Sequence, residues 1–210
     1  MLRPPIGLYQ PYSVTSDDRY PDIFREVRQR VADEPTIRIL SFGCSTGEEV
    51  FALRRYFENS EIVGIDINPM NIALCRWRKW KWTYKRIQFI TSGSAVSQQD
   101  SSIDVILAMA VFRHGDLNIL PPPPRCNHRI RFADFENSVA DLARTLKHGG
   151  LLVIQHAMFR FVDTSVAPEF TTLYTTRLEG SNPLYGPDDC ILPDAETIGL
   201  VFCKTGQFRD

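Results

Sequence analysis

The 210-residue chain contains no hydrophobic run long enough to cross a bilayer, and its first ten residues, MLRPPIGLYQ, contain no signal-peptide core. Neither charge is in excess, because 24 Lys and Arg residues stand against 25 Asp and Glu residues. That balance argues against a protein basic enough overall to bind nucleic acid or anionic lipid. Five cysteines at irregular spacing do not suit a disulfide framework. These absences predict a cytoplasmic protein without a membrane partner.

The turn at residues 41–50, SFGCSTGEEV, lacks both common phosphate-binding patterns. A P-loop needs Gly-Lys followed by Ser or Thr, and the dinucleotide pattern G-x-G-x-x-G fails because Ser45 replaces its second glycine. Glu48 and Glu49 open the helix expected next, where their carboxylates would repel a pyrophosphate. A cationic ligand without phosphate meets no such objection, so the turn predicts a ligand of that kind.

Strand and helix patterns alternate along the chain. Apolar runs predict strands at residues 36–42, 61–66, 86–91, 103–112 and 151–158, with two further candidates at 171–178 and 198–204. Apolar residues at helical spacing predict helices over 19–34, after the turn at 41–50, from Asn68 to about Trp80, and from Phe132 to Leu146. The last of these helices is expected to end with Lys147 and His148, and Gly149 and Gly150 are expected to close it. The alternation predicts an α/β fold, a doubly wound and mostly parallel Rossmann-like sheet with helices on both faces.

The chain length and a hydrophobic content of 43% fit one core, and therefore one domain. Within it, residues 1–35 are expected to form an N-terminal segment and helix, and residues 36–210 the ligand-binding domain. Tyr9 and Tyr12 precede the first helix, where such a segment can act as a lid that excludes water.

Four segments, ILSFGCSTGEE, IVGIDINP, SIDVILAMAVF and ARTLKHGGLLVIQHA, follow one another between residues 37 and 157. In that order they resemble the motifs of the class I S-adenosylmethionine-dependent methyltransferases, and the heptad GCSTGEE is most similar to the chemotaxis-receptor enzymes that modify glutamate. The resemblance implies S-adenosylmethionine as cofactor, a molecule with a sulfonium, an ammonium and no phosphate. The chain lacks the Arg-Asn pair of the chemotaxis enzymes after the fourth strand, so their substrate is not implied.

The resemblance also implies which residues hold the cofactor, with Asp66 on the ribose hydroxyls. The implied set is Gly43, Cys44, Ser45, Gly47, Glu48, Asp66, Ile67, Ser94, Ala95 and Met109. Two positions depart from the family, since Ser41 stands where most members have an acidic residue and Ser94 where an aspartate often contacts adenine. Simpler roles remain open: the glycines could only permit a tight turn, Asp66 could cap a turn with Asn68, and one of the two glutamates could serve only the helix dipole.

Candidate catalytic residues follow the fourth and fifth predicted strands. His114 and Asp116 lie in FRHGD and His156 lies in QHAM, and His114 is the first choice for a general base, if the acceptor must lose a proton. His156 could equally be a structural histidine at a strand end. Methyl transfer from a sulfonium needs no metal, and Cys126 with His128 is poor evidence for a metal site.

The acceptor predicted for the enzyme is a small molecule. There are two alternatives. The protein could bind S-adenosylmethionine without transferring its methyl group, or it could be a methyltransferase that acts on nucleic acid or protein. The segment CRWRKWKWTYKR at 75–86 could stack bases and pair with phosphates. The interpretation favoured here is a helix end with Trp77 and Trp80 packed inward and its cations in water.

Overall fold

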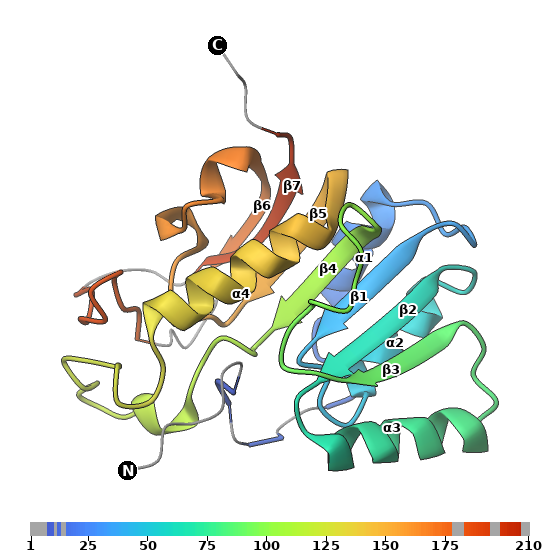
Figure 1. Cartoon of the computed structure of the whole chain (residues 1–210), viewed down its shortest axis with the longest axis horizontal. Helices are drawn as coiled ribbons and strands as arrows, with labels where there is room; N and C mark the ends of the chain where they lie inside the picture. Colours follow the sequence, from blue (N-terminus) through green and yellow to red (C-terminus); the bar gives the residue numbers. More distant parts are fainter. Residues whose placement is uncertain (1–7, 11, 14–15, 178–182, 194–197, 207–210) are drawn as a thin grey trace.

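The computed structural model describes residues 8–10, 12–13, 16–177, 183–193 and 198–206, which contain a mixed sheet in the order β3-β2-β1-β4-β5-β7-β6 (Figure 1). Strands β1 to β5 are parallel, and β7 runs antiparallel to β5 and β6. The predicted doubly wound, mostly parallel sheet is therefore confirmed, and both tail candidates are strands. The strands are β1 (Arg38–Phe42), β2 (Glu61–Asp66), β3 (Ile87–Thr91), β4 (Ile103–Met109), β5 (Leu146–Gln155), β6 (Phe170–Arg177) and β7 (Ile198–Lys204).

Helices cover both faces of the sheet. Helices α1 (Pro21–Arg30), α2 (Glu48–Tyr56) and α3 (Pro69–Lys81) pack on one face, and α4 (Phe132–Thr145) packs on the other. Asn68 caps α3 as the Asn-Pro pair predicts, because its side chain accepts a hydrogen bond from the Met70 N–H. Nowhere in the described ranges does a helix combine the length and the apolar character needed to cross a membrane.

The predicted end of the fourth helix is wrong. Helix α4 ends at Thr145, and the residues Lys147 to Gly150 lie in β5. The pairing with β4 shifts there, since Leu146 is opposite Ile103 but Leu151 is opposite Val105. Four residues therefore bulge out against one, and the Lys147 ammonium pairs with the Asp104 carboxylate at 2.8 Å. The two glycines belong to this bulge rather than to a helix cap.

The strand order places β1 between β2 and β4, which is the point where the chain reverses its direction across the sheet. Connections diverge above the carboxyl ends of the strands at such a point, and ligands of open α/β sheets bind there. The connections after β3 and β5 contain no α-helix in the described part of the chain, as their weak helical pattern predicts. The sequence therefore places its glycine turn at the expected edge of the sheet.

Candidate functional site

The turn after β1 has left-handed backbone conformations at Gly43, Ser45 and Gly47, with φ of 73°, 50° and 93°. The N–H groups of Gly43 and Cys44 both donate to the carbonyl of Ile65, which ties the turn to the end of β2. A Cβ on Gly43 would lie 2.5 Å from Val111 Cγ2, and one on Gly47 would lie 2.9 Å from the Phe51 ring. Both glycines therefore serve the close approach of the turn to its neighbours, and only Gly43 lines the cavity above it.

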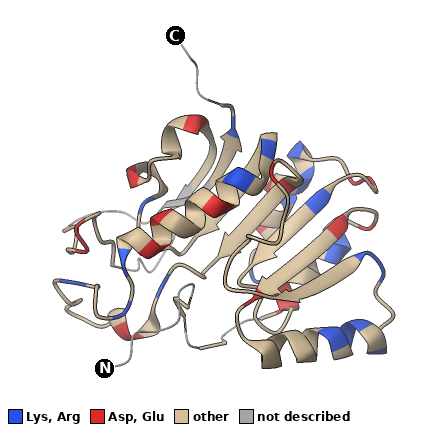
Figure 2. Cartoon of the chain, viewed as in Figure 1, with Lys and Arg blue, Asp and Glu red and all other residues tan. Residues whose placement is uncertain are grey.

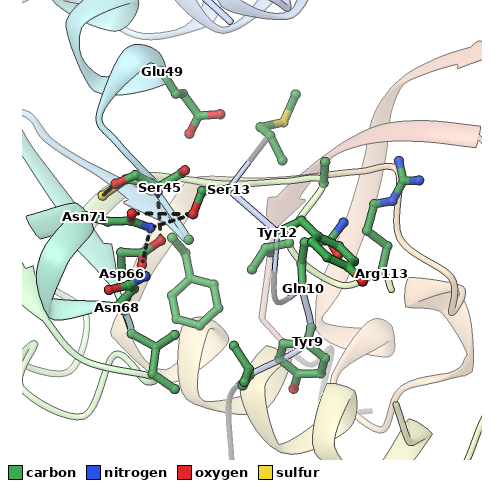
Figure 3. Close-up of a pocket in the computed structure, with 18 of the residues that line it drawn as sticks. Tyr9, Gln10, Tyr12, Ser13, Ser45, Glu49, Asp66, Asn68, Asn71 and Arg113 are labelled. Atoms are coloured by element: carbon green, nitrogen blue, oxygen red, sulfur yellow. Dashed lines mark hydrogen bonds between the residues drawn. The ribbon is translucent and has the colours of Figure 1, made fainter. Parts of the chain in front are cut away.

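A cavity of about 370 Å³ lies at the carboxyl ends of β1, β2 and β4 (Figure 3). Its walls are the segment before α1, the turn after β1, the start of α3, and the loops after β3 and β4. Asp66, Asn68 and Asn71 lie on one side of the view, and Tyr12 and Arg113 lie on the other. Six residues of the implied cofactor set line it: Gly43, Cys44, Ser45, Asp66, Ile67 and Met109.

The Asp66 carboxylate already has three hydrogen bonds within the chain. Its Oδ1 accepts from the Asn68 N–H at 2.9 Å and from the Asn71 amide at 3.2 Å, and its Oδ2 accepts from the Ser45 N–H at 2.8 Å. The capping role is therefore present in the structure. Because a carboxylate oxygen accepts about two hydrogen bonds, Oδ2 retains the capacity for one ligand hydroxyl.

The two glutamates of the turn point to different partners. Glu48 forms an ion pair with Arg78 at 2.6 Å, accepts from the Thr46 hydroxyl, and does not line the cavity. Glu49 lines the cavity, and the Ser41 hydroxyl donates to its carboxylate at 2.6 Å. Burial raises the pKa of Glu49 to about 7, against the opposing effects of the Ser41 hydrogen bond and the charge of Arg19. Of the two glutamates, only Glu49 therefore reaches the cavity, and the cofactor-binding role expected for Glu48 stays a prediction.

The loop after β3 reaches the cavity two residues earlier than predicted. Ser92 and Gly93 line the cavity, whereas Ser94 and Ala95 do not. The Ala95 side chain is buried, and its N–H donates to the Asp141 carboxylate of α4 at 2.7 Å. This bond ties Ala95 to α4, away from the cavity.

None of the three candidate catalytic residues lines the cavity. His114 is buried, its Nδ1 accepts from the Asp116 N–H at 3.2 Å, and burial lowers its pKa. The Asp116 carboxylate pairs with Arg129 at 3.0 Å and accepts from the Tyr12 hydroxyl at 3.1 Å. The neighbours of His114, Arg113 and Gly115, line the cavity in its place.

His156 lies against Tyr20, with 5.7 Å between the ring centroids. Burial, followed by the charges of Arg19 and Arg113, lowers the pKa of His156 to about 4, so the ring is neutral at pH 7. Tyr20, Arg19 and Arg113 line the cavity, and sequence analysis did not identify any of them. The contact between Tyr20 and His156 joins the residue before α1 to the loop after β5, and Arg113 lines the cavity from the loop after β4, so no local sequence pattern indicates this arrangement.

Three residues that line the cavity each have a buried polar atom with no hydrogen-bond partner among the described residues. These atoms are the Tyr20 hydroxyl, Ser45 Oγ and Arg113 Nε. Buried polar atoms in folded proteins are normally satisfied, so three in one cavity indicate a polar ligand. Burial raises the pKa of Tyr20 to about 12, which keeps its hydroxyl a neutral donor.

The segment before α1 closes the side of the cavity. The Tyr9 hydroxyl bonds to the Asp134 carbonyl at 2.5 Å and to the Ser138 hydroxyl at 2.7 Å, and the Asn71 amide donates to Ser13 at 3.0 Å. Tyr9 is 3% exposed, while Tyr12 is 52% exposed. The segment thus bridges α4 and α3 across the ends of the strands. Its action as a lid stays a prediction, as does the division at residue 35.

The site contains no obvious metal centre. Within the described ranges, no group of three or more His, Cys, Asp or Glu side chains is arranged to hold a metal ion. Cys126 is buried, and all five cysteines are free thiols. The polar side chains that line the cavity include the carboxylates of Asp66 and Glu49, the guanidinium groups of Arg19 and Arg113, and several hydroxyl groups.

Comparison with known proteins assigns the family. Residues 33–177 match the family model described as a methyltransferase domain. Over 109 residues the chain is 27% identical to the malonyl-[acyl-carrier protein] O-methyltransferase of Bacillus cereus, covering 48% of this chain and 39% of that protein. Over 118 residues it is 27% identical to the demethylmenaquinone methyltransferase of Thermus thermophilus, covering 56% of this chain and 46% of that protein. The matches thus span less than half the length of either relative.

A solved S-adenosylmethionine-dependent methyltransferase from Aquifex aeolicus has the same fold. The TM-score is 0.54 at 12% sequence identity, over 86% of this chain and 89% of that chain. The family match covers the turn after β1, Asp66 and the strands that surround the cavity. The chain belongs to the class I S-adenosylmethionine-dependent methyltransferase family.

Proposed function

We propose that the chain transfers the methyl group of S-adenosylmethionine to a small-molecule acceptor bound in the 370 Å³ cavity. The observation that carries the proposal is the composition of that cavity. Two carboxylates, Asp66 and Glu49, line it together with the three residues that carry the unpartnered polar atoms. The names of two relatives, a malonyl-[acyl-carrier protein] O-methyltransferase and a demethylmenaquinone methyltransferase, support methyl transfer.

The residues of the cavity fit the groups of S-adenosylmethionine. Asp66 Oδ2 can accept from a ribose hydroxyl, and Glu49 offers a negative charge to the sulfonium or the ammonium. Arg19 and Arg113 offer positive charge to a carboxylate, which both the cofactor and an acceptor can carry. When bound, the cofactor supplies a methyl group on a positively charged sulfur.

The protein contributes positioning and the exclusion of water. Buried Tyr9 and half-buried Tyr20 line the cavity as aromatic walls, and an acceptor held between them has few orientations available. Asp116 and His156 act on the cavity indirectly, because Asp116 holds Tyr12 and His156 holds Tyr20, and both tyrosines line the cavity. His114 acts in the same way through the turn that it caps. In this proposal they are positioning residues rather than general bases.

The acceptor is proposed to be small because the N-terminal segment covers the side of the cavity and leaves room for a group of limited size. We also propose that the protein functions in a reducing compartment such as the cytoplasm, which the five free thiols support.

Calorimetry tests the first part of the proposal. S-adenosylmethionine and S-adenosylhomocysteine should bind, whereas NAD and ATP should not. Tight NAD binding without S-adenosylmethionine binding would contradict the assignment. Incubation with cofactor carrying a labelled methyl group and a metabolite extract tests the second part. Label should move to compounds of low molecular mass, and binding without any consumption would favour a cofactor-binding protein that does not transfer the methyl group.

A further inference from the structure

Helix α3 exposes the tryptophans that sequence analysis expected to be buried. Trp77 is 50% exposed and Trp80 is 76% exposed, so the predicted inward packing is wrong. The helix buries Ile72 and Cys75 against the sheet. Trp77 follows Cys75 by two positions, about 200° around the helix, and therefore points away from the core.

The exposed tryptophans continue an apolar stripe along the helix. Met70 is 75% exposed and Leu74 is 38% exposed, and with Trp77 they stand at spacings of four and three residues, on one side of α3. Trp80 follows Trp77 by three residues. We call these four residues, Met70, Leu74, Trp77 and Trp80, the outer face of α3. The helix thus has two apolar sides, of which one is in contact with the core and the other is in contact with water.

Positive charge surrounds this outer face. No Asp or Glu occurs between residues 67 and 99, while six Lys and Arg residues do. Figure 2 shows Lys and Arg along the C-terminal half of α3 and no acidic residue on it. Arg78 is paired with Glu48, and Lys81 Nζ lies 5.0 Å from the centroid of the Trp77 ring. Within the described ranges, the other five cations form no ion pair with a carboxylate: Arg76, Lys79, Lys81, Lys85 and Arg86.

We propose that the outer face of α3 docks on an anionic lipid surface. Tryptophan rings favour the boundary between lipid headgroups and acyl chains, and lysines and arginines beside them are attracted to anionic headgroups. This proposal replaces the expectation that the protein has no membrane partner, and it describes peripheral contact rather than a spanning helix. It does not rest on the proposed methyl transfer.

Three features favour lipid over other occupants. Met70 and Leu74 are aliphatic side chains that gain from contact with acyl chains and offer nothing to a nucleic-acid base. Tryptophans and aliphatic residues stand out from one helix at the outer edge of the sheet, beside β3, where a planar surface can reach them together. A second copy of the chain would bring the same unpaired cations against one another, which opposes self-association through this face.

The outer face begins at the cavity. Asn71, which lines the cavity and bonds to Asp66, directly follows Met70 in the first turn of α3. Docking through Met70 and Trp77 would therefore bring the α3 side of the cavity close to the lipid surface.

Tryptophan fluorescence tests the proposal directly, because all three tryptophans lie at residues 77, 80 and 82. The full chain is titrated with vesicles of phosphatidylcholine, with and without phosphatidylglycerol. We expect a blue shift and sedimentation with the anionic vesicles, and loss of both at high salt. In the Trp77→Ala/Trp80→Ala variant, Trp82 still reports and partitioning falls at least about tenfold. The Lys79→Gln/Lys81→Gln variant should bind more weakly to the anionic vesicles only, and its binding to the phosphatidylcholine vesicles should not change.

Ile119→Ala/Leu120→Ala is the matched control, because these side chains are 57% and 97% exposed at a different site. It should partition like the unaltered chain, and circular dichroism should show each variant folded. Equal binding by Trp77→Ala/Trp80→Ala, or no binding of the unaltered chain to anionic vesicles, would overturn the proposal. Tryptophan-dependent binding of single-stranded RNA without vesicle binding would assign the face to nucleic acid, and tryptophan-dependent dimerisation in sedimentation would assign it to a second copy.

Discussion

The affinity for S-adenosylmethionine should depend on pH through Glu49. Burial raises the pKa of this carboxyl to about 7 in the protein alone, and Ser41 holds it at the cavity. A cationic ligand interacts favourably only with the ionised form, so binding lowers the pKa of Glu49 and releases a proton near neutral pH. Affinity is therefore highest above pH 7 and falls as the pH decreases through 7.

The size of the effect follows from the ionised fraction. With a pKa of about 7, Glu49 is about 90% ionised at pH 8 and about 10% ionised at pH 6. If the cofactor holds the pKa of Glu49 below 6, affinity falls about tenfold between pH 8 and pH 6, or by about 1.4 kcal/mol. The amino group of the ligand titrates over the same range, and a variant without the carboxyl separates the two contributions.

Glu49→Gln is that variant, because its amide oxygen still accepts the Ser41 hydrogen bond. Calorimetry from pH 5.5 to 8.5, in buffers of different ionisation enthalpy, measures both affinity and proton release. The tenfold change and the released proton that belong to Glu49 should disappear in Glu49→Gln, which leaves only the contribution of the ligand's amino group. They should remain in Glu48→Gln, the matched control, whose carboxylate pairs with Arg78 outside the cavity. An unchanged pH profile in Glu49→Gln would refute the reasoning.

Three further predictions concern the same cavity. Glu49 has a pKa of about 7 in the folded protein and 4.5 in the unfolded chain, so its ionisation destabilises the fold. In urea denaturation, Glu49→Gln should therefore raise the free energy of unfolding by about 1–3 kcal/mol at pH 8 and by little at pH 4. Equal gains at both pH values would contradict this. Arg113→Gln should weaken binding of S-adenosylmethionine about tenfold and of its decarboxylated analogue much less, if the arginine holds the carboxylate of the cofactor; equal losses, or none, would assign Arg113 to another group. Asp66→Asn should weaken cofactor binding about ten- to a hundredfold in calorimetry. It should also lower the melting temperature, because an amide cannot accept from both the Ser45 and Asn68 N–H groups. An unchanged affinity would leave Asp66 with its capping role alone.

The sequence predicts the sheet and the turn after β1 well because both depend on local patterns. Apolar runs define the strands, and the spacing of Gly43 and Gly47 reflects steric limits within one turn. Asp66 is predictable for the same reason, since a polar residue that directly follows a buried strand lies at the carboxyl edge of the sheet. In each of these cases the residues that decide the structure are neighbours in the chain.

Other parts of the site depend on contacts that are distant in sequence. Whether Glu48 or Glu49 enters the cavity depends on a rotation of about 100° along α2, and Arg78 of α3 decides it by pairing with Glu48. Ala95 is withdrawn by Asp141, which is 46 residues away. The environment of His156 depends on Tyr20, which precedes α1. No periodicity or motif within one segment reports such pairs.

The pairing of Ser41 with Glu49 explains how this chain departs from its family without losing a carboxylate at the turn. Most members of the family that the sequence resembles have an acidic residue at the position of Ser41. This position lies on β1, at the centre of the sheet between β2 and β4. Here the strand supplies a hydroxyl, and α2 supplies the carboxylate at 2.6 Å from it. A side chain that reaches in from α2 has one hydrogen bond to offset its burial, which is why its pKa rises to about 7. The ionised carboxylate is then destabilising until a cation arrives, so the cofactor should raise the melting temperature more at pH 8 than at pH 6.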